Sequence, residues 1–380
     1  MHNQIASLIK TLKFYIPSNL KDRLFISKDG FREPIFSHII AHSIFRFWIY
    51  PSYWRYLFTN ILSNFGMWQL HQANIDKLSN NTRYLTGIPN PYAGIGHQLC
   101  NWNTAFIFAS KYNLKFVHYP FTSKLKKSDW DKFLGFGEGE LQYDEIVKKK
   151  LLKIVKLPRI WWNTDDKIGQ DIVNKIINCT YLGSNILFHL DSDQSVYDYT
   201  VVQKEMRTKY WNTRNKNPIN YEFKQDRLNI AVHIRRGDIL KLNKNEKNFQ
   251  ERWLDNKYFI NIINAIKNLL PEANIDIHIF SQGNSSDFKE FEKIDNVVYH
   301  LDEDEYQTFH SMIVADILLL SPSSFSYFTG LISKGLKIAK YPWLHEIPED
   351  SEWIRSDKNG SFNPQVLIER FTKMSNKVKI

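Results

Sequence analysis

The sequence predicts an α/β fold built on parallel sheets, and three observations lead to this prediction. Residues 228–234 form a largely apolar run, typical of a strand that is covered on both faces. From residue 229 to residue 340, short apolar runs alternate with segments of helical periodicity, which indicates a Rossmann-like domain of about 115 residues. Before this domain, a glycine-rich turn opens a helix that leads into a strand over 114–119, a common α/β beginning.

Composition limits the kinds of partner. The chain has 380 residues, of which 43% are hydrophobic and 24% charged, as in ordinary globular proteins. The formal net charge is +10, but lysines are scattered among acids, which favours a general positive field over a nucleic-acid groove. We therefore expect no nucleic-acid partner. Cys100 and Cys179 are the two cysteines, too few for a disulfide framework or a cysteine zinc site.

Residues 1–85 carry no chemical motif and are rich in aromatic side chains. The rings recur at roughly helical spacing, which favours a helical region that packs into a core. An amphipathic surface lying at a membrane interface is the alternative, so peripheral membrane contact stays open. The longest apolar stretch, residues 35–50, is too short to span a membrane and contains Arg46. With no signal peptide recognised, we expect a cytoplasmic protein.

The rest of the chain divides into three further regions: an N-terminal α/β domain over 86–225, a Rossmann-like domain over 226–345 and a helical tail over 346–380. In the first, we expect strands over 114–119 and 186–190 and a helix over 201–211. In the Rossmann-like domain, the patterns predict the following elements. Strands are expected over 229–234, 275–280, 297–301, 317–320 and 337–340, and helices over 256–269, 286–293, 306–315 and 324–334; the tail adds a helix over 364–374.

Two adjacent arginines, a glycine and a carboxylate follow the apolar run at 228–234. Because charged residues do not belong inside such a strand, Arg235 and Arg236 should lie at its carboxyl end, where open α/β sheets bind their ligands. Two planar guanidinium groups beside Gly237 suggest a bound anion, most simply a diphosphate. The alternative is a structural salt bridge between a strand-end arginine and Asp238.

Two more strand-to-helix turns suit an anion. Residues 321–326, SPSSFS, place hydroxyl groups beside the first N–H groups of a helix, although an ordinary helix cap has the same pattern. Residues 94–98, GIGHQ, form the glycine-rich turn, for which a simple tight turn is the alternative. Within one β-α series, the arginine and serine turns can face the same crevice and together form a pocket for a diphosphate bridge.

These three turns resemble the motifs of one enzyme family. His233-Ile234-Arg235-Arg236-Gly237-Asp238 is similar to the His-x-Arg-Arg-x-Asp motif of α1,2- and α1,6-fucosyltransferases, and residues 94–99 resemble their Gly-x-Gly-x-Gln motif. Residues 315–326 are similar to their third motif, which ends in paired serines. The resemblance implies a GT-B-like fold with two Rossmann-like domains. It also implies an inverting, metal-independent transfer of fucose from GDP-fucose to a glycan hydroxyl, with no cofactor.

The resemblance also implies residue roles. Arg235 would hold the β-phosphate of GDP, while Arg236 and Asp238 shape the site. Ser324 would contact phosphate and His233 would help to place the nucleotide. The remaining residues expected to contact the donor belong to the glycine and serine turns, namely Gly94, Gly96, His97, Gln98, Ser323 and Phe325.

The chain departs from the family pattern on the acceptor and nucleobase sides. The acidic base of the α1,6 branch corresponds to Asn243, so Glu246 becomes the candidate, with His97 as another. The aspartate that binds guanine corresponds to Thr308, and Gln282 stands where the family often has an acid. Two rivals therefore stay open: a transferase using another nucleotide sugar, and a non-catalytic glycan- or membrane-binding protein with a decayed transferase fold. The Asp-x-Asp pattern at 191–193 is not expected to bind a metal.

Overall fold

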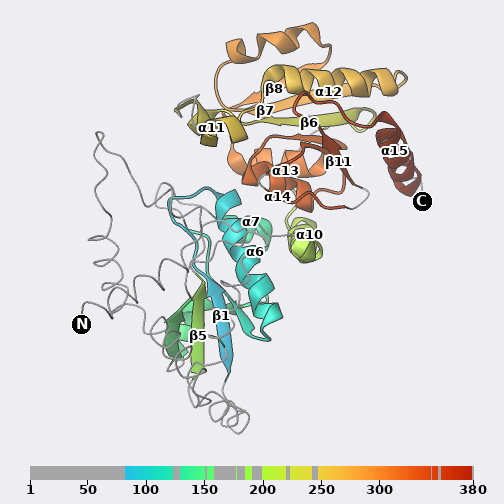
Figure 1. Ribbon diagram of the computed structural model, residues 1–380. Helices are drawn as coiled ribbons and strands as arrows, with labels where there is room; N and C mark the ends of the chain where they lie inside the picture. Colours follow the sequence, from blue (N-terminus) through green and yellow to red (C-terminus); the bar gives the residue numbers. More distant parts are fainter. Residues whose placement is uncertain are drawn as a thin grey trace, which may run out of the picture. The chain divides into compact units, whose positions relative to one another are not determined.

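The computed structural model describes residues 82–122, 129–149, 152–157, 177, 185–190, 199–219, 223–241, 247–343, 345–349 and 352–378. The aromatic-rich N-terminal region and the Asp-x-Asp pattern at 191–193 lie outside these residues, and so does Glu246. Within the described part, two parallel sheets with flanking helices follow one another along the chain (Figure 1). They confirm the predicted α/β, GT-B-like class with two Rossmann-like units.

The first sheet has five parallel strands in the order β3-β2-β1-β5-β4. Its described elements are β1 (Arg83–Gly87), α6 (Ile95–Lys111), β2 (Lys115–His118), α7 (Trp130–Leu134), β3 (Leu141–Gln142), α8 (Tyr143–Lys149), β4 (Leu152–Lys156), β5 (Asn185–Leu190) and α10 (Thr200–Lys216). The chain builds outward from β1 on one side and then returns to its other side, so the switch point lies between β1 and β5. The glycine turn at 94–98 follows β1 and opens α6.

The second sheet has six parallel strands in the order β11-β10-β9-β6-β7-β8. Its elements are β6 (Leu228–Ile234), a 3₁₀ turn η1 (Gly237–Lys241), α11 (Lys247–Arg252), α12 (Asn256–Leu269), β7 (Ile275–Ser281), η2 (Ser285–Lys293), β8 (Val297–Leu301), α13 (Glu305–Val314), β9 (Ile317–Leu320), α14 (Ser324–Ile332), β10 (Leu336–Lys340), β11 (Trp353–Ser356) and α15 (Pro364–Val378). Here the switch point lies between β6 and β9.

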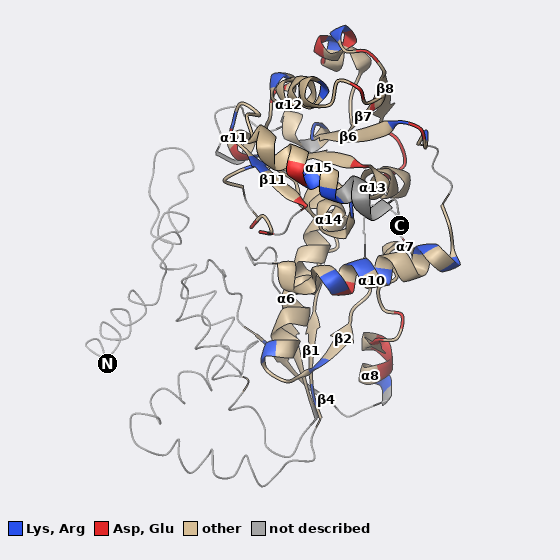
Figure 2. Cartoon of the chain, turned by 90° about the vertical axis from the view of Figure 1, so that its right-hand side faces the viewer, with Lys and Arg blue, Asp and Glu red and all other residues tan. Residues whose placement is uncertain are grey.

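One apolar cluster connects the helices of both sheets. It includes Leu99 and Trp102 of α6, Met206 of α10, Phe309 of α13 and Phe328 of α14. The almost uncharged sequence of α6 explains its position, because 12 of its 17 residues are buried, and Figure 2 shows it almost wholly without charge. By contrast, α10 carries bands of Lys and Arg (Figure 2). A second cluster covers the other face of the second sheet, where α12 packs.

Most predicted elements of the second sheet are confirmed, and the differences in both sheets concern short elements and helix ends. The segment at 285–293 is a 3₁₀ helix rather than an α-helix, and α14 ends at Ile332 rather than at residue 334. The sequence pattern also suggests Gly335 as the cap of this helix, but the cap is Ser333. A Cβ on Gly335 would lie 2.6 Å from the carbonyl oxygen of Asp316, so the backbone approaches too closely for a side chain. In the first sheet, α8 ends at Lys149 and β4 follows over Leu152–Lys156, a strand that the sequence pattern did not predict. β11, also not predicted, extends the second sheet to residue 356.

The first sheet begins at Arg83, so it includes the last residues of the region predicted as 1–85. The division of the chain at residues 85, 225 and 345 stays a prediction. None of the helices in the described part of the chain is long and apolar enough to cross a membrane.

Candidate functional site: a cleft at the strand switch point

A cleft of about 640 Å³ lies at the carboxyl ends of β6 and β9, at the switch point of the second sheet. Open α/β sheets bind ligands at this place, because neighbouring connections leave there in opposite directions and open a crevice. All three predicted turns contribute to its wall. The lining includes Gly94, Gly96 and His97 from the glycine turn, His233, Arg235 and Arg236 from the arginine turn, and Ser323, Ser324 and Phe325 from the serine turn.

The backbone at Arg235 is held by the serine turn. Its N–H donates to the Ser321 hydroxyl at 2.9 Å, and this hydroxyl donates to the carbonyl of His233 at 2.6 Å. On the other side of β6, the Ser281 hydroxyl donates to the carbonyl of Ile234 at 2.7 Å. The end of β6 is therefore fixed from both neighbouring strands, and the side chain of Arg235 starts from a rigid backbone at the wall of the cleft.

Arg236 has a different environment. Its side chain is buried and donates to the carbonyls of Arg235 and Leu254, at 2.9 and 3.2 Å, and to the Asn256 amide oxygen at 2.8 Å. Its guanidinium lies 3.9 Å from the centre of the Trp253 ring. Burial lowers the pKa of Arg236 to about 10, which still leaves it charged at neutral pH. Arg236 thus braces the turn and adds positive charge to the cleft.

Two helices begin at the cleft and touch there. A Cβ on Gly96 would lie 2.6 Å from the Ser324 carbonyl carbon and closer still to the Phe325 nitrogen. Only glycine allows the first turn of α6 to approach the first turn of α14 in this way. Since both helix starts present N–H groups and the positive end of a helix dipole, their contact concentrates positive potential beside the two arginines.

The hydroxyl of Ser324 is held by His345, a residue that the sequence analysis missed because no motif marks it. Ser324 Oγ lies 2.9 Å from Nε2 of the buried His345 ring. Burial lowers the pKa of His345 to about 3, so the ring is neutral and carries one N–H. Its other nitrogen, Nδ1, is buried and has no hydrogen-bond partner within the described part of the chain. Buried N–H groups without an acceptor are rarer than buried acceptors without a donor, which favours the proton on Nε2.

In this tautomer, His345 donates to Ser324 Oγ, and the hydroxyl hydrogen of Ser324 stays available for donation. Cys100 is the neighbour that competes for it: burial raises the pKa of its thiol to about 12, and hydrogen bonds with Tyr199 and Ser324 oppose that rise. Sulfur is a weak acceptor. An anion in the cleft would therefore be the better acceptor for the Ser324 hydroxyl.

His233 lies beside the arginines as a neutral ring. Burial, followed by the charges of Arg235 and Arg236, lowers its pKa to about 3. Its Nδ1 is hydrogen-bonded to the Ser326 hydroxyl, and its ring lies 5.7 Å from that of Phe325. The ring can thus exchange hydrogen bonds with a ligand while adding no charge to the cleft.

Gln98 has a structural role in this structure. Its amide nitrogen donates to the carbonyls of Ala93 and Thr122, at 2.9 and 2.7 Å, and its oxygen accepts from the Thr122 N–H at 3.0 Å. The side chain ties the glycine turn to the loop after β2 and is not among the cleft-lining residues. Asp238 follows in η1, where its backbone alone is described.

Acidic side chains gather on the side of the cleft near β8. Asp302, Glu303 and Glu305 line it together with Thr308 and Gln282. Asp302 accepts from the Gly283 N–H at 3.1 Å, and Glu303 is hydrogen-bonded to His300 at 2.8 Å. The cleft therefore has a basic end formed by arginines and helix starts, and an acidic end. Among the described residues, no group of three or more His, Cys, Asp or Glu could hold a metal ion.

Comparisons with known proteins add a likeness in fold only. Neither a family model nor a curated protein matches the sequence. The structure is similar to POFUT1 in complex with GDP, at 13% identity and a TM-score of 0.40, over 67% of this chain and 96% of that one. FUT1 of Arabidopsis thaliana, a mutant in complex with GDP, shares 10% identity at a TM-score of 0.38, over 72% and 73%. E. coli heptosyltransferase WaaC with ADP shares 9% at 0.34, over 78% and 99%. These values are too low to bear on donor or reaction, for which the residues of the cleft are the basis.

Proposed function

We propose that the protein is a glycosyltransferase that moves fucose from GDP-fucose to a hydroxyl of a glycan acceptor, with inversion and without a metal. The observation that carries this proposal is the convergence of three sequence-distant turns on one cleft. The arginine turn, the serine turn and the glycine turn line it together, and Gly96 lies against the start of α14. Two arginines and two helix starts at one place are what a diphosphate requires.

The same residues suit the departure of GDP. In the reaction, the bond between sugar C1 and the β-phosphate oxygen breaks as the acceptor oxygen bonds to C1 from the opposite face. The growing negative charge on the diphosphate would be stabilised by Arg235, by the Ser324 hydroxyl and by the N–H groups that begin α14. Because these groups are fixed before the reaction, their stabilisation is greatest in the transition state. Fixed cationic groups can perform this task in place of a divalent metal.

The acidic end of the cleft supports a guanine nucleotide. Guanine presents an N–H and an amino group on one edge, and carboxylates accept from such groups. Asp302, Glu303 and Glu305 line the same cleft as Arg235, and so does Thr308, which stands where the family has its guanine-binding aspartate. The acceptor proton needs a base: His97 lines the cleft and is a candidate, and Glu246 stays a second one.

The test is transfer of fucose from GDP-fucose to a panel of glycans, with donor hydrolysis measured in parallel. Arg235→Ala should lower transfer and hydrolysis by about 100-fold or more, because it removes a charge that stabilises the leaving group. Arg355→Ala is the matched control, since Arg355 is exposed on β11 and pairs with the exposed Glu349 at 3.5 Å. Near wild-type turnover by Arg235→Ala would overturn the proposal.

The two rivals differ from the proposal in measurable ways. A panel of GDP-, UDP- and ADP-sugars in thermal unfolding identifies the donor, because only a bound nucleotide raises the unfolding temperature by mass action. Stabilisation by UDP-sugars alone would indicate a different donor for the same class of enzyme. Glycan binding with no GDP release from any donor would favour the non-catalytic protein.

A further inference from the structure

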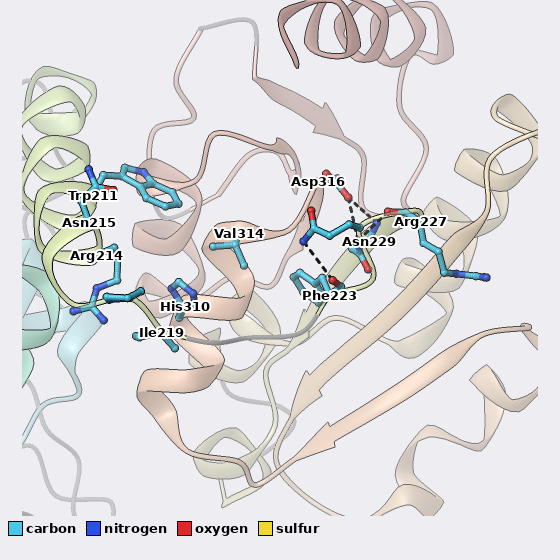
Figure 3. Close-up of a pocket in the computed structure, with 12 residues that line it drawn as sticks. Trp211, Arg214, Asn215, Ile219, Phe223, Arg227, Asn229, His310, Val314 and Asp316 are labelled. Carbon is cyan, nitrogen blue, oxygen red and sulfur yellow. Dashed lines mark hydrogen bonds between the residues drawn. The ribbon is translucent and has the colours of Figure 1, made fainter. Parts of the chain in front are cut away.

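A second cavity, of about 400 Å³, lies at the opposite edge of the second sheet from the cleft (Figure 3). Asn229 and Asp316, at the amino ends of β6 and β9, form one end of it, and Trp211 and Arg214 of α10 lie at the other (Figure 3). The nucleotide proposed above has no role here. Asp316 stands at the start of the third motif, at the opposite end of β9 from the serine turn, and the other three residues belong to none of the motifs. The cavity therefore needs its own explanation.

Three lining side chains each have one buried polar atom with no hydrogen-bond partner among the residues that the structure describes. They are Oδ1 of Asn229, Nε1 of Trp211 and Nε of Arg214. Asn229 is 5% exposed and lines the cavity, where Figure 3 shows it beside Asp316. A buried polar group without a partner destabilises a protein, because it has lost its hydrogen bonds to water and gained none in return. The cavity thus offers an acceptor at one end and donors at the other.

Hydrogen bonds hold the rest of Asn229 in place, so the position of its Oδ1 atom does not depend on rotation of the side-chain amide. Its amide nitrogen donates to the carbonyls of Lys224 and Arg227, at 3.0 and 2.9 Å, and its backbone N–H donates to the Asp316 carboxylate at 2.8 Å. Turning the amide over would break the two side-chain bonds. The oxygen is therefore fixed in place as an acceptor for a donor that enters the cavity.

The cavity has charged residues of opposite sign at its two ends, which disfavours a ligand that carries only positive or only negative charge. Arg214 lies at one end and Asp316 at the other, while the charge of Arg227 is matched by Asp276 at 2.6 Å. Burial lowers the pKa of His310 to about 4, so this lining residue is neutral. A phosphate or a carboxylate attracted by Arg214 would face the Asp316 carboxylate across the cavity.

Between the two polar ends, the cavity has an apolar wall. Ile219, Phe223 and Val314 contribute to it, and the uncharged polar side chains of Asn215 and Gln225 also line the cavity. A pyranose ring matches this arrangement, because its faces are C–H surfaces and each hydroxyl on its rim both donates and accepts. Such a ring can donate to Asn229 and Asp316 and accept from Trp211 and Arg214 at once.

We propose that this cavity binds one sugar unit of a glycan, at a site separate from the nucleotide cleft. The inference stands on the cavity alone and does not depend on the proposed transfer reaction. The most direct probe is saturation-transfer NMR on the full chain with L-fucose, D-mannose, D-glucose and N-acetylglucosamine, each with and without saturating GDP. Glycine and inorganic phosphate serve as the zwitterionic and anionic alternatives.

Val314→Phe fills the cavity from a half-buried position, and Val298→Phe makes the same change at an exposed position on β8. At least one sugar should bind, GDP should not displace it, and Val314→Phe should weaken binding at least tenfold while Val298→Phe leaves it unchanged. Trp211→Phe keeps an aromatic ring and removes the indole N–H. It should therefore weaken binding of the same sugar, even where Val314→Phe disturbs folding. No binding by any sugar, displacement by GDP, equal binding by all variants, or binding of glycine or phosphate alone would overturn the proposal.

Discussion

Arg235 and Arg236, adjacent in the arginine turn, have different roles. Arg236 is buried, donates to two backbone carbonyls and to Asn256, and packs on Trp253. Arg235 starts from a backbone fixed by Ser321 and lines the cleft. The sequence suggested this division of roles. Apart from the carbonyl of Arg235, however, the partners of Arg236 come from residues 253–256, about 20 positions away, and no local pattern indicates them.

His345 gives the sharpest prediction at the residue scale. If its Nε2–H orients the Ser324 hydroxyl for donation to phosphate, His345→Leu should weaken GDP binding about tenfold, equivalent to about 1.4 kcal/mol. His345→Gln keeps an N–H in a similar place and should bind within about threefold of the wild type. Calorimetric titration with GDP measures both. Equal losses in the two variants would mean that the ring matters for packing alone.

The buried histidines also predict an acid-sensitive fold. The pKa values of His233 and His345 are lowered by burial to about 3 in the folded chain, below the ordinary value of 6.5. The unfolded chain therefore takes up protons below pH 6.5 that the folded chain does not, and stability falls as the pH falls. In urea unfolding, His345→Gln should lose about 2 kcal/mol less than the wild type between pH 7 and pH 5. Parallel losses would contradict this account of the ring.

At the scale of elements, the two motif glycines separate contact from turn geometry. A Cβ on Gly96 would collide with the backbone that begins α14, whereas a Cβ on Gly94 would meet nothing within 4 Å. Gly96→Ala should push the two helix starts apart, destabilise the fold by about 1–3 kcal/mol and weaken GDP binding at least tenfold. Gly94→Ala is the matched control and should be close to wild type in unfolding and titration. Similar behaviour of the two variants would show that the helix contact is not needed.

A buried ion cluster ties α10 to the end of the second sheet. Lys337 is fully buried and lies 2.6 Å from the Glu352 carboxylate, which also pairs with Arg207. Arg207 donates to the carbonyl of Leu331 at 2.8 Å and to that of Ser333 at 2.6 Å, at the end of α14. The cluster therefore joins the helix layer to the strand β10.

Removing the carboxylate charge of Glu352 should lower the free energy of unfolding. Burial works to raise the pKa of Glu352, but Lys337 and Arg207 hold it below its ordinary value. Glu352→Gln should destabilise the fold by about 3 kcal/mol at pH 7, since it leaves Lys337 charged and buried. The difference from the wild type should shrink as the pH falls through the folded-state pKa of Glu352. Glu349→Gln, at an 88% exposed position, should be neutral in the same urea titrations.

Sequence patterns predicted long elements better than short ones. β6, β7 and α12 have continuous or clearly periodic apolar positions, and the structure confirms them. β4 and β11 were missed: each is short and mixes lysine or arginine with apolar residues, and neither continues the regular β-α alternation by which the equally short β9 and β10 could be recognised. The cleft lining could be foreseen from three motifs, whereas His345 and the second cavity arise from contacts between distant segments.

At the scale of the whole molecule, the described chain places two cavities at opposite edges of one sheet. The cleft lies where the carboxyl ends of β6 and β9 meet the start of α6, and the second cavity lies at their amino ends beside α10. One apolar cluster runs through α6, α10, α13 and α14 and links the helices of the two sheets. This core holds the glycine turn against the second sheet. The cleft depends on that contact, because the glycine turn forms part of its wall. The net charge of +10 favours anionic ligands in general, so specificity must come from the cleft itself.

A crystal structure of the chain with GDP would show whether the cleft binds the nucleotide. We expect the diphosphate to lie between the Arg235 guanidinium and the first N–H groups of α14, within hydrogen-bond distance of the Ser324 hydroxyl. Guanine should point toward Asp302, Glu303 and Glu305. Arg235→Ala crystals treated in the same way should lose the nucleotide. GDP bound elsewhere on the chain, or retained in the cleft with its diphosphate away from Arg235, would contradict the account.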